Sequence, residues 1–220
     1  NIPVMMACLS IWYNNFFDYR THAIIPYSEN LKSFSKYLQQ ASMESNGKQT
    51  DRSNNLIEYQ TGQIIWGQTG TNAQHSFFQL LHQGSKIIPS DFIGFCKSIT
   101  GEKDHHDILM ANFFAQTKAL MSGTRDNVVE SNHKLFKGDR PTNTILIDKL
   151  TPESLGSLIA MYEHKIFTLG VIWNILSFDQ FGVELGKKLA TNILQDIENH
   201  DFSNHDSSTK NLLKRYLSTD

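Results

Sequence analysis

The chain has 220 residues, enough for one large domain or a domain with extensions. Hydrophobic residues make up 40% and charged residues 19%, and the formal net charge is -2, which is typical of an ordinary globular protein. No excess of basic residues predicts a nucleic-acid partner. Two cysteines, Cys8 and Cys96, are too few for a disulfide framework, so we expect a reducing, cytoplasmic location.

No apolar run is long enough to cross a membrane, because Asn14, Asn15 and Asp18 interrupt the first one. No basic segment followed by a cleavage site marks a secretion signal. The first residue is Asn1, and an apolar stretch typical of a buried helix follows it at once. We therefore interpret the sequence as a piece of a longer chain, with simple N-terminal trimming as the alternative.

Along the first half of the chain, the hydrophobic pattern predicts helices around one short strand. The expected elements, in order, are a buried helix over residues 4–17, an amphipathic helix over residues 31–40, a polar loop over residues 44–62 and a strand over residues 64–67. Thr71 or Asn72 can then cap a helix that begins there.

The second half alternates strands with helices. The expected elements are a strand within residues 86–96, a helix over residues 107–121, a strand over residues 143–149, a helix over residues 152–167, a helix within residues 178–196 and a last short helix around Leu212, Leu213 and Tyr216. This alternation predicts an α/β domain with a largely parallel sheet.

A carboxylate stands where the second helix gives way to a glycine-containing loop. Gln40 and Glu44 are four residues apart, so they share a face if the helix continues that far. A carboxylate held there can serve as a general base. A solvated loop glutamate is the alternative, and on these residues alone it is the better one.

Glycines and small polar residues at residues 67–74 predict a tight turn before a helix. The N-terminus of a helix favours anions. His75 is expected in the first turn of this helix, where it can exchange a proton near neutral pH. A histidine that merely forms a hydrogen bond is the alternative.

Near the C-terminal end, Gln180, Glu184 and Lys187 are spaced by four and then three residues, which places them on one face of a helix. Lys187 would present a cation to a ligand on that face. An exposed Glu–Lys surface pair is the alternative. Gly182 and Gly186 weaken that alternative slightly, because small residues in a helix indicate the close approach of a backbone or a ligand.

Three other features are interpreted as structural. Arg140 precedes a predicted strand, and as a buried residue it could hold a loop through a bidentate contact. His105 and His106 are adjacent on a predicted helix and do not face one point, so no metal site is predicted. Cys96 has no CxxC partner and is expected in the core.

Taken together, these motifs resemble the phosphoglucose isomerase (glucose-6-phosphate isomerase) family. Residues 170–187 read GVIWNILSFDQFGVELGK and are similar to the C-terminal signature of that family. Residues 67–84, 110–120, 138–143 and 161–165 also match its pattern. The resemblance covers nearly the whole chain, and the motifs are long and specific.

The resemblance implies the fold and the domain organisation. It implies the larger sugar-isomerase (SIS-type) domain of the family, a three-layer α/β/α sandwich, over residues 1–198, followed by a C-terminal tail and helix over residues 199–220. The smaller N-terminal SIS-type domain has no counterpart in this sequence. That domain carries the phosphate-gripping loop and an Arg that steadies the intermediate.

The resemblance also implies an activity, the interconversion of glucose 6-phosphate and fructose 6-phosphate through a cis-enediol(ate), without a cofactor or a metal. The base of the family matches Glu44, its ring-opening histidine matches His75, and its lysine matches Lys187. Gln40 and Gln180 match positions that line the substrate site. The histidine comes from the neighbouring subunit, so the resemblance implies a homodimer.

One departure from the family pattern concerns the turn before His75. The usual Gly-Glu-Pro-Gly-Thr-Asn is replaced by a segment with Gln68 and Thr69, which alters the loop but leaves His75 in place. We expect this departure to have only a modest effect.

Three alternative functions remain open on the sequence. The first is a sugar-phosphate-binding module without catalysis, against which Glu44 argues, because a module that only binds needs no base. The second is a structural or interaction role for an isolated fragment. The third is an SIS-type isomerase of another sugar phosphate, such as an amino sugar, against which the long C-terminal signature argues.

Overall fold

The computed structural model describes residues 1–124 and 131–218. The chain divides into two compact units, Asn1–Phe178 and Asp179–Asp220. The boundary expected after residue 198 falls inside the second unit, so the helix that precedes it groups with the C-terminal tail in the structure.

A parallel sheet forms the centre of the first unit. Its strands, β1 (Thr21–Pro26), β2 (Ile64–Trp66), β3 (Ser90–Lys97) and β4 (Thr142–Lys149), lie in the order β2-β1-β3-β4. Ala23 of β1 lies opposite Trp66 of β2 and Ser90 of β3, and Ser90 lies opposite Thr142 of β4. Every neighbouring pair runs parallel, so the predicted α/β fold is confirmed for the described residues.

Strand β1 lies in the middle of this sheet, and the sequence pattern does not predict it. His22, Ala23, Ile24 and Ile25 are all at most 1% exposed. A strand covered on both faces lacks the alternation of apolar and polar residues that normally indicates a strand. This inner strand was therefore the hardest one to recognise.

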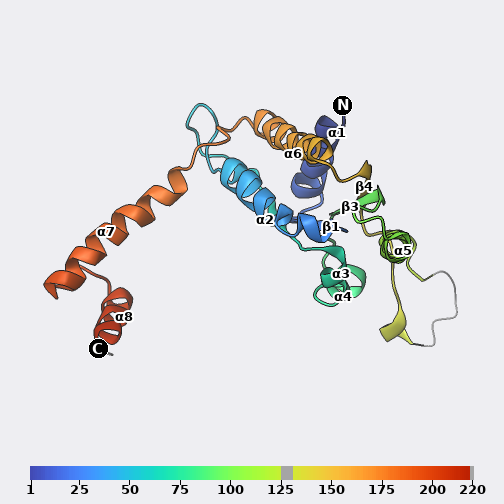
Figure 1. The fold of residues 1–220 in the computed structure, drawn as a ribbon. Coiled ribbons are helices and arrows are strands. Elements are labelled where there is room, and N and C mark those ends of the chain that lie inside the picture. The colour runs from blue at the N-terminus through green and yellow to red at the C-terminus, as the bar shows by residue number, and fades with distance from the viewer. Residues whose placement is uncertain (125–130, 219–220) are drawn as a thin grey trace. The chain divides into compact units, whose positions relative to one another are not determined.

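Helices cover both faces of the sheet, which gives three layers (Figure 1). On one face, Ile24 and Ile93 pack in a core cluster with residues of α1 (Ile2–Ile11), α2 (Phe34–Leu38) and α6 (Pro152–Ile172). On the other face, Ile25 and Phe92 pack with residues of α3 (Gly70–Gln74), α4 (Phe78–Gln83) and α5 (Lys103–Ser122). Adjacent strand residues point to opposite faces, so β1 and β3 each supply both clusters.

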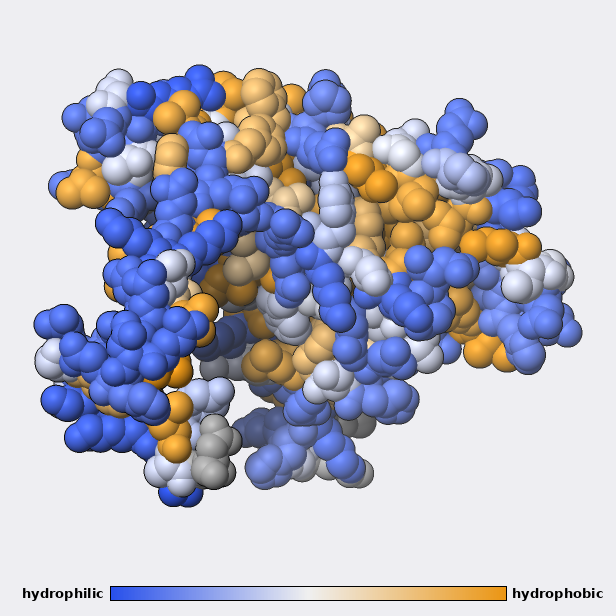
Figure 2. Space-filling view, turned by 60° about the vertical axis from the view of Figure 1, so that its left-hand side comes forward, coloured by the Kyte–Doolittle hydropathy of each residue, from blue (hydrophilic) through white to orange (hydrophobic). Residues whose placement is uncertain are grey.

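The first helix is buried on one side only, which corrects the expectation of a buried helix. Met6, Ala7 and Ser10 of α1 are buried, whereas Met5 is 63% exposed and Cys8 is also exposed. The helix continues as a π-helical segment, Trp12–Phe16. The uniform hydrophobicity of this segment therefore predicted a helix correctly, but it did not show which face of the helix is buried. Figure 2 shows that apolar residues reach the surface in several places.

Other helices extend beyond their predicted bounds. Helix α5 begins at Lys103, before the expected residue 107, and ends at Gly123 as expected. Helix α6 begins at Pro152, where the Thr151 side chain accepts a hydrogen bond from the Ser154 amide, and it runs on to Ile172. The added residues at the start of α5, 103–106, are polar and carry little periodic signal, so pattern analysis places that end poorly.

The second unit consists of helices in its described part. A 3₁₀ turn at Phe181–Val183 leads into α7 (Glu184–Asn199), and α8 (Ser207–Leu217) follows after a polar connection. The Asp206 carboxylate caps α8 by accepting hydrogen bonds from the Ser208 and Thr209 amides. Both expected helices are therefore present. Over the residues that the structure describes, no helix has the length and apolar character needed to span a bilayer.

Candidate active site

The segment that carries Glu44 is a helix end widened into a π-helix. Helix α2 continues directly into a π-helical turn, Gln39–Glu44. Such turns occur frequently at functional sites. Glu44 is half-buried and Gln40 is exposed. Because the hydrogen bonds of a π-helix run five residues back, residues four apart still lie about one turn apart, so Gln40 and Glu44 stay on one side of the helix.

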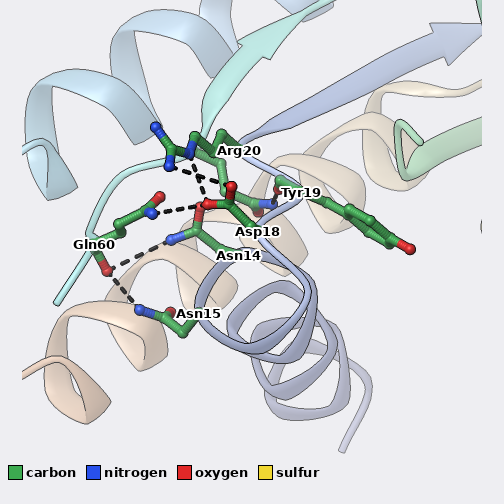
Figure 3. A network of polar contacts seen from close by, with 7 residues as sticks. Asn14, Asn15, Asp18, Tyr19, Arg20 and Gln60 are labelled. Carbon is green, nitrogen blue, oxygen red and sulfur yellow. Dashed lines mark hydrogen bonds and ion pairs between the residues drawn. The ribbon is translucent and has the colours of Figure 1, made fainter. Parts of the chain in front are cut away.

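The loop that follows Glu44 is fastened to the end of the first helix (Figure 3). The side-chain amide of Asn15 donates to the Gln60 carbonyl oxygen at 2.8 Å, and the Gln60 amide donates to the Asp18 carboxylate at 2.9 Å. Arg20 completes the network with two hydrogen bonds to Asp18, at 2.7 and 3.2 Å. Closer to Glu44, the Lys48 ammonium donates to the Glu44 backbone oxygen at 2.7 Å. These hydrogen bonds therefore hold the predicted loop in a defined conformation.

His75 does not lie in the first turn of its helix, contrary to the prediction. Helix α3 is short, and His75 is its C-terminal cap, exposed to solvent. The argument from a helix N-terminus therefore does not apply to His75. Residues 67–69 join β2 to α3 as a short irregular connection rather than the predicted tight turn. Gly67 has a φ of 137°, and a side chain there would overlap the backbone of Ile24.

Glu44 and His75 stand on opposite sides of β2 in chain order. Two parallel strands need a connection that returns to the starting edge of the sheet. Glu44 stands at the end of that returning helix, before β2 begins, whereas His75 follows the carboxyl end of β2. Figure 1 shows α2 extending away from α3 and α4. No hydrogen bond or ion pair joins these two residues in the part of the chain that the structure describes.

Gln180 and Lys187 belong to the second unit, and the expected common face holds only in part. Gln180 precedes the 3₁₀ turn with a non-helical backbone (φ -125°, ψ 34°), so it does not share a helical face with Glu184. Glu184 and Lys187 are three residues apart in α7 and do share one. Gly182 lies in the 3₁₀ turn and Gly186 lies inside α7, and a side chain at either position would meet no described atom within 4 Å, so the expected close approach is not found there.

Arg140 has the structural role that the sequence predicts. The side chain is 8% exposed, and its guanidinium donates to the backbone oxygens of Lys86, at 3.1 Å, and of Gly84, at 2.8 Å. It thereby holds the turn between α4 and β3 against the start of β4. The contact joins one guanidinium to two carbonyl groups of a single loop, as a bidentate clamp would.

We expect Arg140→Met to lower the free energy of unfolding by about 2–3 kcal/mol, because the substitution leaves buried carbonyl groups without their charged donor. Thermal unfolding of the purified protein measures the effect. Lys137→Met, which removes a charge from an exposed position nearby, is the control and should change stability little. Equal effects of the two substitutions would contradict the assigned clamp.

A buried polar cluster between the sheet and α6 was missed by sequence reasoning. Asp91 is 0% exposed, and its carboxylate lies 2.9 Å from His22 Nε2. The carboxylate also accepts hydrogen bonds from the Asn143 amide, at 2.7 Å, and from the Tyr162 hydroxyl, at 2.8 Å. Lys165, also buried, lies near the same group. The available signal was an aspartate inside an otherwise apolar strand.

The charges around Asp91 decide its ionisation. Burial alone would raise the pKa of Asp91, but His22 and Lys165 outweigh that effect and hold the pKa well below its ordinary value. Burial lowers the pKa of Lys165, and the Asp91 carboxylate opposes that shift. Burial and the same carboxylate raise the pKa of Tyr162. The cluster is thus a compensated charge network in the core.

The structure describes the neighbours of the His105–His106 pair and the exposure of Cys96. His105 Nδ1 lies 3.2 Å from Glu102, and His106 Nε2 lies 2.9 Å from the Phe95 carbonyl oxygen, so each ring has its own neighbour. Within residues 1–124 and 131–218, no group of three or more His, Cys, Asp or Glu side chains could hold a metal ion. Cys96 is exposed rather than in the core, because it stands near the end of β3, beyond the part that the helices cover.

The layers, the parallel sheet and the strand order define the first unit as an SIS-type α/β/α domain. The sequence profile described as phosphoglucose isomerase matches residues 1–213. Since this match spans most of the chain, the chain belongs to the phosphoglucose isomerase family. The resemblance noted from the motifs is thereby confirmed.

Relatives with curated names include the glucose-6-phosphate isomerases of Christiangramia forsetii, 58% identical over 99% of this chain, and Gloeobacter violaceus, 54% identical over 98%. A crystal structure of a glucose-6-phosphate isomerase from Chlamydia trachomatis covers 100% of this chain with a TM-score of 0.86 and 42% identity. A hypothetical protein from Thermus thermophilus, 22% identical with a TM-score of 0.65 over 87% of the chain, shares the fold alone.

The chain matches only part of each of these relatives. It spans 43% of the Christiangramia forsetii protein, 41% of the Gloeobacter violaceus protein and 42% of the Chlamydia trachomatis chain. More than half of each relative therefore has no counterpart among these 220 residues.

Proposed function

We propose that this chain works as the C-terminal part of a cytoplasmic glucose-6-phosphate isomerase, which interconverts glucose 6-phosphate and fructose 6-phosphate in glycolysis and gluconeogenesis. The observation that carries the proposal is the half-buried Glu44 at a braced helix end, in a chain that is 53–58% identical to relatives named for this activity. A module that only binds sugar phosphates would have no use for a base held in this way.

The reaction begins with the closed sugar ring. His75, assisted by Lys187, moves protons at the ring oxygen and at the C1 hydroxyl and so opens the ring. An imidazole is suited to this step because it can both donate and accept a proton near neutral pH. Gln40 and Gln180 line the substrate site.

Glu44 carries out the isomerisation itself. Its carboxylate removes the proton from C2, a cis-enediol(ate) forms, and the same carboxyl group returns a proton to C1. One base has to reach two adjacent carbons, so a carboxylate on a firmly placed segment suits the task. The step moves a proton within one substrate molecule and requires no external oxidant or reductant.

The remaining parts of the site come from outside this chain. Charge develops on the enediolate oxygen and needs cationic or N–H donors nearby. Lys187 is one such group, and the N-terminal domain supplies the Arg and the phosphate-binding loop that the family resemblance implies. A second subunit supplies His75. The position of Glu44 before β2 and of His75 after the carboxyl end of β2 supports this last assignment.

Subunit complementation tests both the reaction and the dimer. The full-length parent protein is expected to convert fructose 6-phosphate to glucose 6-phosphate in a coupled assay, and Glu44→Gln and His75→Gln should each abolish nearly all activity. A heterodimer of the two variants contains one site with both Glu44 and His75 intact. We therefore expect heterodimers isolated with two affinity tags to recover about half of the parent activity, as a site shared between subunits requires.

The controls separate the possible failures. If Glu44 and His75 acted within one chain, every site of the heterodimer would lack one of them, and no activity would return. If the parent protein itself were inactive but bound fructose 6-phosphate, the sugar-phosphate-binding module would be the better interpretation. Turnover of an amino-sugar phosphate instead would identify the alternative isomerase.

A further inference from the structure

Asn46 is a fully buried polar side chain two residues after Glu44. It is 0% exposed, and its amide nitrogen donates to the Ile166 carbonyl oxygen of α6 at 3.0 Å. Its amide oxygen accepts a hydrogen bond from the Ser177 hydroxyl at 2.6 Å. Because a buried amide is costly without partners, these two contacts determine where this helix end can lie.

Helix α6 is shaped to receive this pair. A side chain at Gly170 would overlap the Ser177 hydroxyl and would come within ordinary contact of the Asn46 amide oxygen. Glycine at this position therefore lets Asn46 and Ser177 meet directly above the helix. The same buried stripe of α6 contains Tyr162, which is fixed to Asp91 of the sheet. The Asn46 contact thus joins the helix end to a rigid part of the core.

A second contact fixes the other end of the same helical segment. The Tyr37 hydroxyl donates to the Glu163 carboxylate of α6 at 2.6 Å. The segment between Tyr37 and Asn46, which includes Glu44, is therefore attached to α6 at both ends. A shift of Glu44 along or about its helix would break at least one of these hydrogen bonds.

We propose that Asn46 is a positioning residue for the base Glu44, with Ser177 as its supporting partner. This inference rests on the proposed function. In this role Asn46 makes no contact with the substrate. It fixes the position and rotation of the helix end that presents the Glu44 carboxylate to C2 and C1. Ser177 also stands three residues before Gln180, so the same hydrogen bond joins the segment that bears the base to the signature segment, residues 170–187.

The test uses the full-length protein and measures kcat, KM and the isotope effect with substrate deuterated at C2. Asn46→Ala is expected to lower kcat per folded molecule by about 100-fold with a smaller change in KM, because a misplacement of about 1 Å has effects of that size. The C2 isotope effect should rise, since proton removal becomes the slow step. Ser177→Ala, which removes one of the two contacts, should have the same effects to a smaller degree.

Gln63→Ala is the matched control. Gln63 is 5% exposed, and its amide donates to the Tyr19 carbonyl oxygen at 3.0 Å, so the substitution removes a buried hydrogen bond of the same kind in another place. It should lower thermal stability without changing kcat per folded molecule or the isotope effect. In a Glu44→Gln background, Asn46→Ala should cause no further loss of kcat, because the group that it positions is already absent.

The outcomes distinguish a failure of the positioning role of Asn46 from a failure of the proposed isomerase function. An active parent whose Asn46→Ala and Ser177→Ala variants keep their kcat and isotope effect overturns the positioning role alone. A loss that is equal in the Gln63→Ala control also overturns it, since a general loss of stability then explains the result. A parent protein without isomerase activity overturns the proposed function and this inference together. If Asn46→Ala does not fold, Ser177→Ala decides the matter.

Discussion

Glu44→Gln in the full-length protein is expected to lower kcat by about 10²- to 10⁴-fold, the usual contribution of a general base, while fructose 6-phosphate still binds. Glutamine has nearly the same shape as glutamate and keeps a hydrogen-bonding end, but it cannot accept the C2 proton. The coupled assay measures turnover, and calorimetric titration with fructose 6-phosphate measures binding. A large loss of turnover with retained binding identifies Glu44 as the base.

A second carboxylate provides the comparison. Glu58 is exposed in the loop that follows Glu44, so Glu58→Gln makes the same change of charge in the same region. We expect Glu58→Gln to leave kcat unchanged. If Glu44→Gln retained near-normal turnover, the base would lie elsewhere, and the assignment made from the family resemblance would be wrong.

Asp91→Asn is expected to give the largest loss of stability among the substitutions considered, about 3–5 kcal/mol, because it removes one member of a buried charge network and leaves its partners uncompensated. His22 and Lys165 are both buried beside Asp91, and its carboxylate favours the charged form of Lys165. Urea unfolding at neutral pH, followed by circular dichroism, measures the effect. Asp148→Asn is the control, because Asp148 pairs with Lys97 on the surface and is worth about 0–1 kcal/mol.

The pH dependence of stability gives an independent check on Asp91. Its pKa in the folded protein is held below the ordinary value of 3.8, so the folded state binds fewer protons than the unfolded state in this range. The stabilisation is therefore complete above about pH 4 and is lost as the pH falls further, towards the folded-state pKa. The unsubstituted protein should lose stability steeply in this window, and Asp91→Asn should lose less. If the two proteins lost the same amount of stability as the pH fell, the assigned network would be contradicted.

Much of the candidate site was accessible from local sequence. The spacing of Gln40 and Glu44 on one helical side holds because a helix does continue through both residues. Arg140 clamps a loop, as its place before a strand indicated. Motif similarity found the family, and the match over residues 1–213 confirms it. The catalytic roles of Glu44, His75 and Lys187 stay predictions that the experiments above address.

Local pattern was misleading where helix ends or burial decide the outcome. His75 is a C-terminal cap because α3 already begins at Gly70, and Gln180 lies outside a helix because α7 begins only at Glu184. Cys96 is exposed because the helices do not cover that end of β3. In each case, a shift of a few residues at the end of an element changes the direction of a side chain, and local preferences do not set such ends to the residue.

The sequence by itself determined the alternation of strands and helices, the parallel sheet and the motifs, because these depend on periodicity and on residues close together in the chain. Only the tertiary structure decided that β1 is one of the two inner strands, since burial on both faces erases the pattern that would reveal it. It alone joined Asp91 to Tyr162, 71 residues away, and Asn46 to Ser177, 131 residues away. Such contacts depend on how distant segments pack, and no local preference of either residue encodes them.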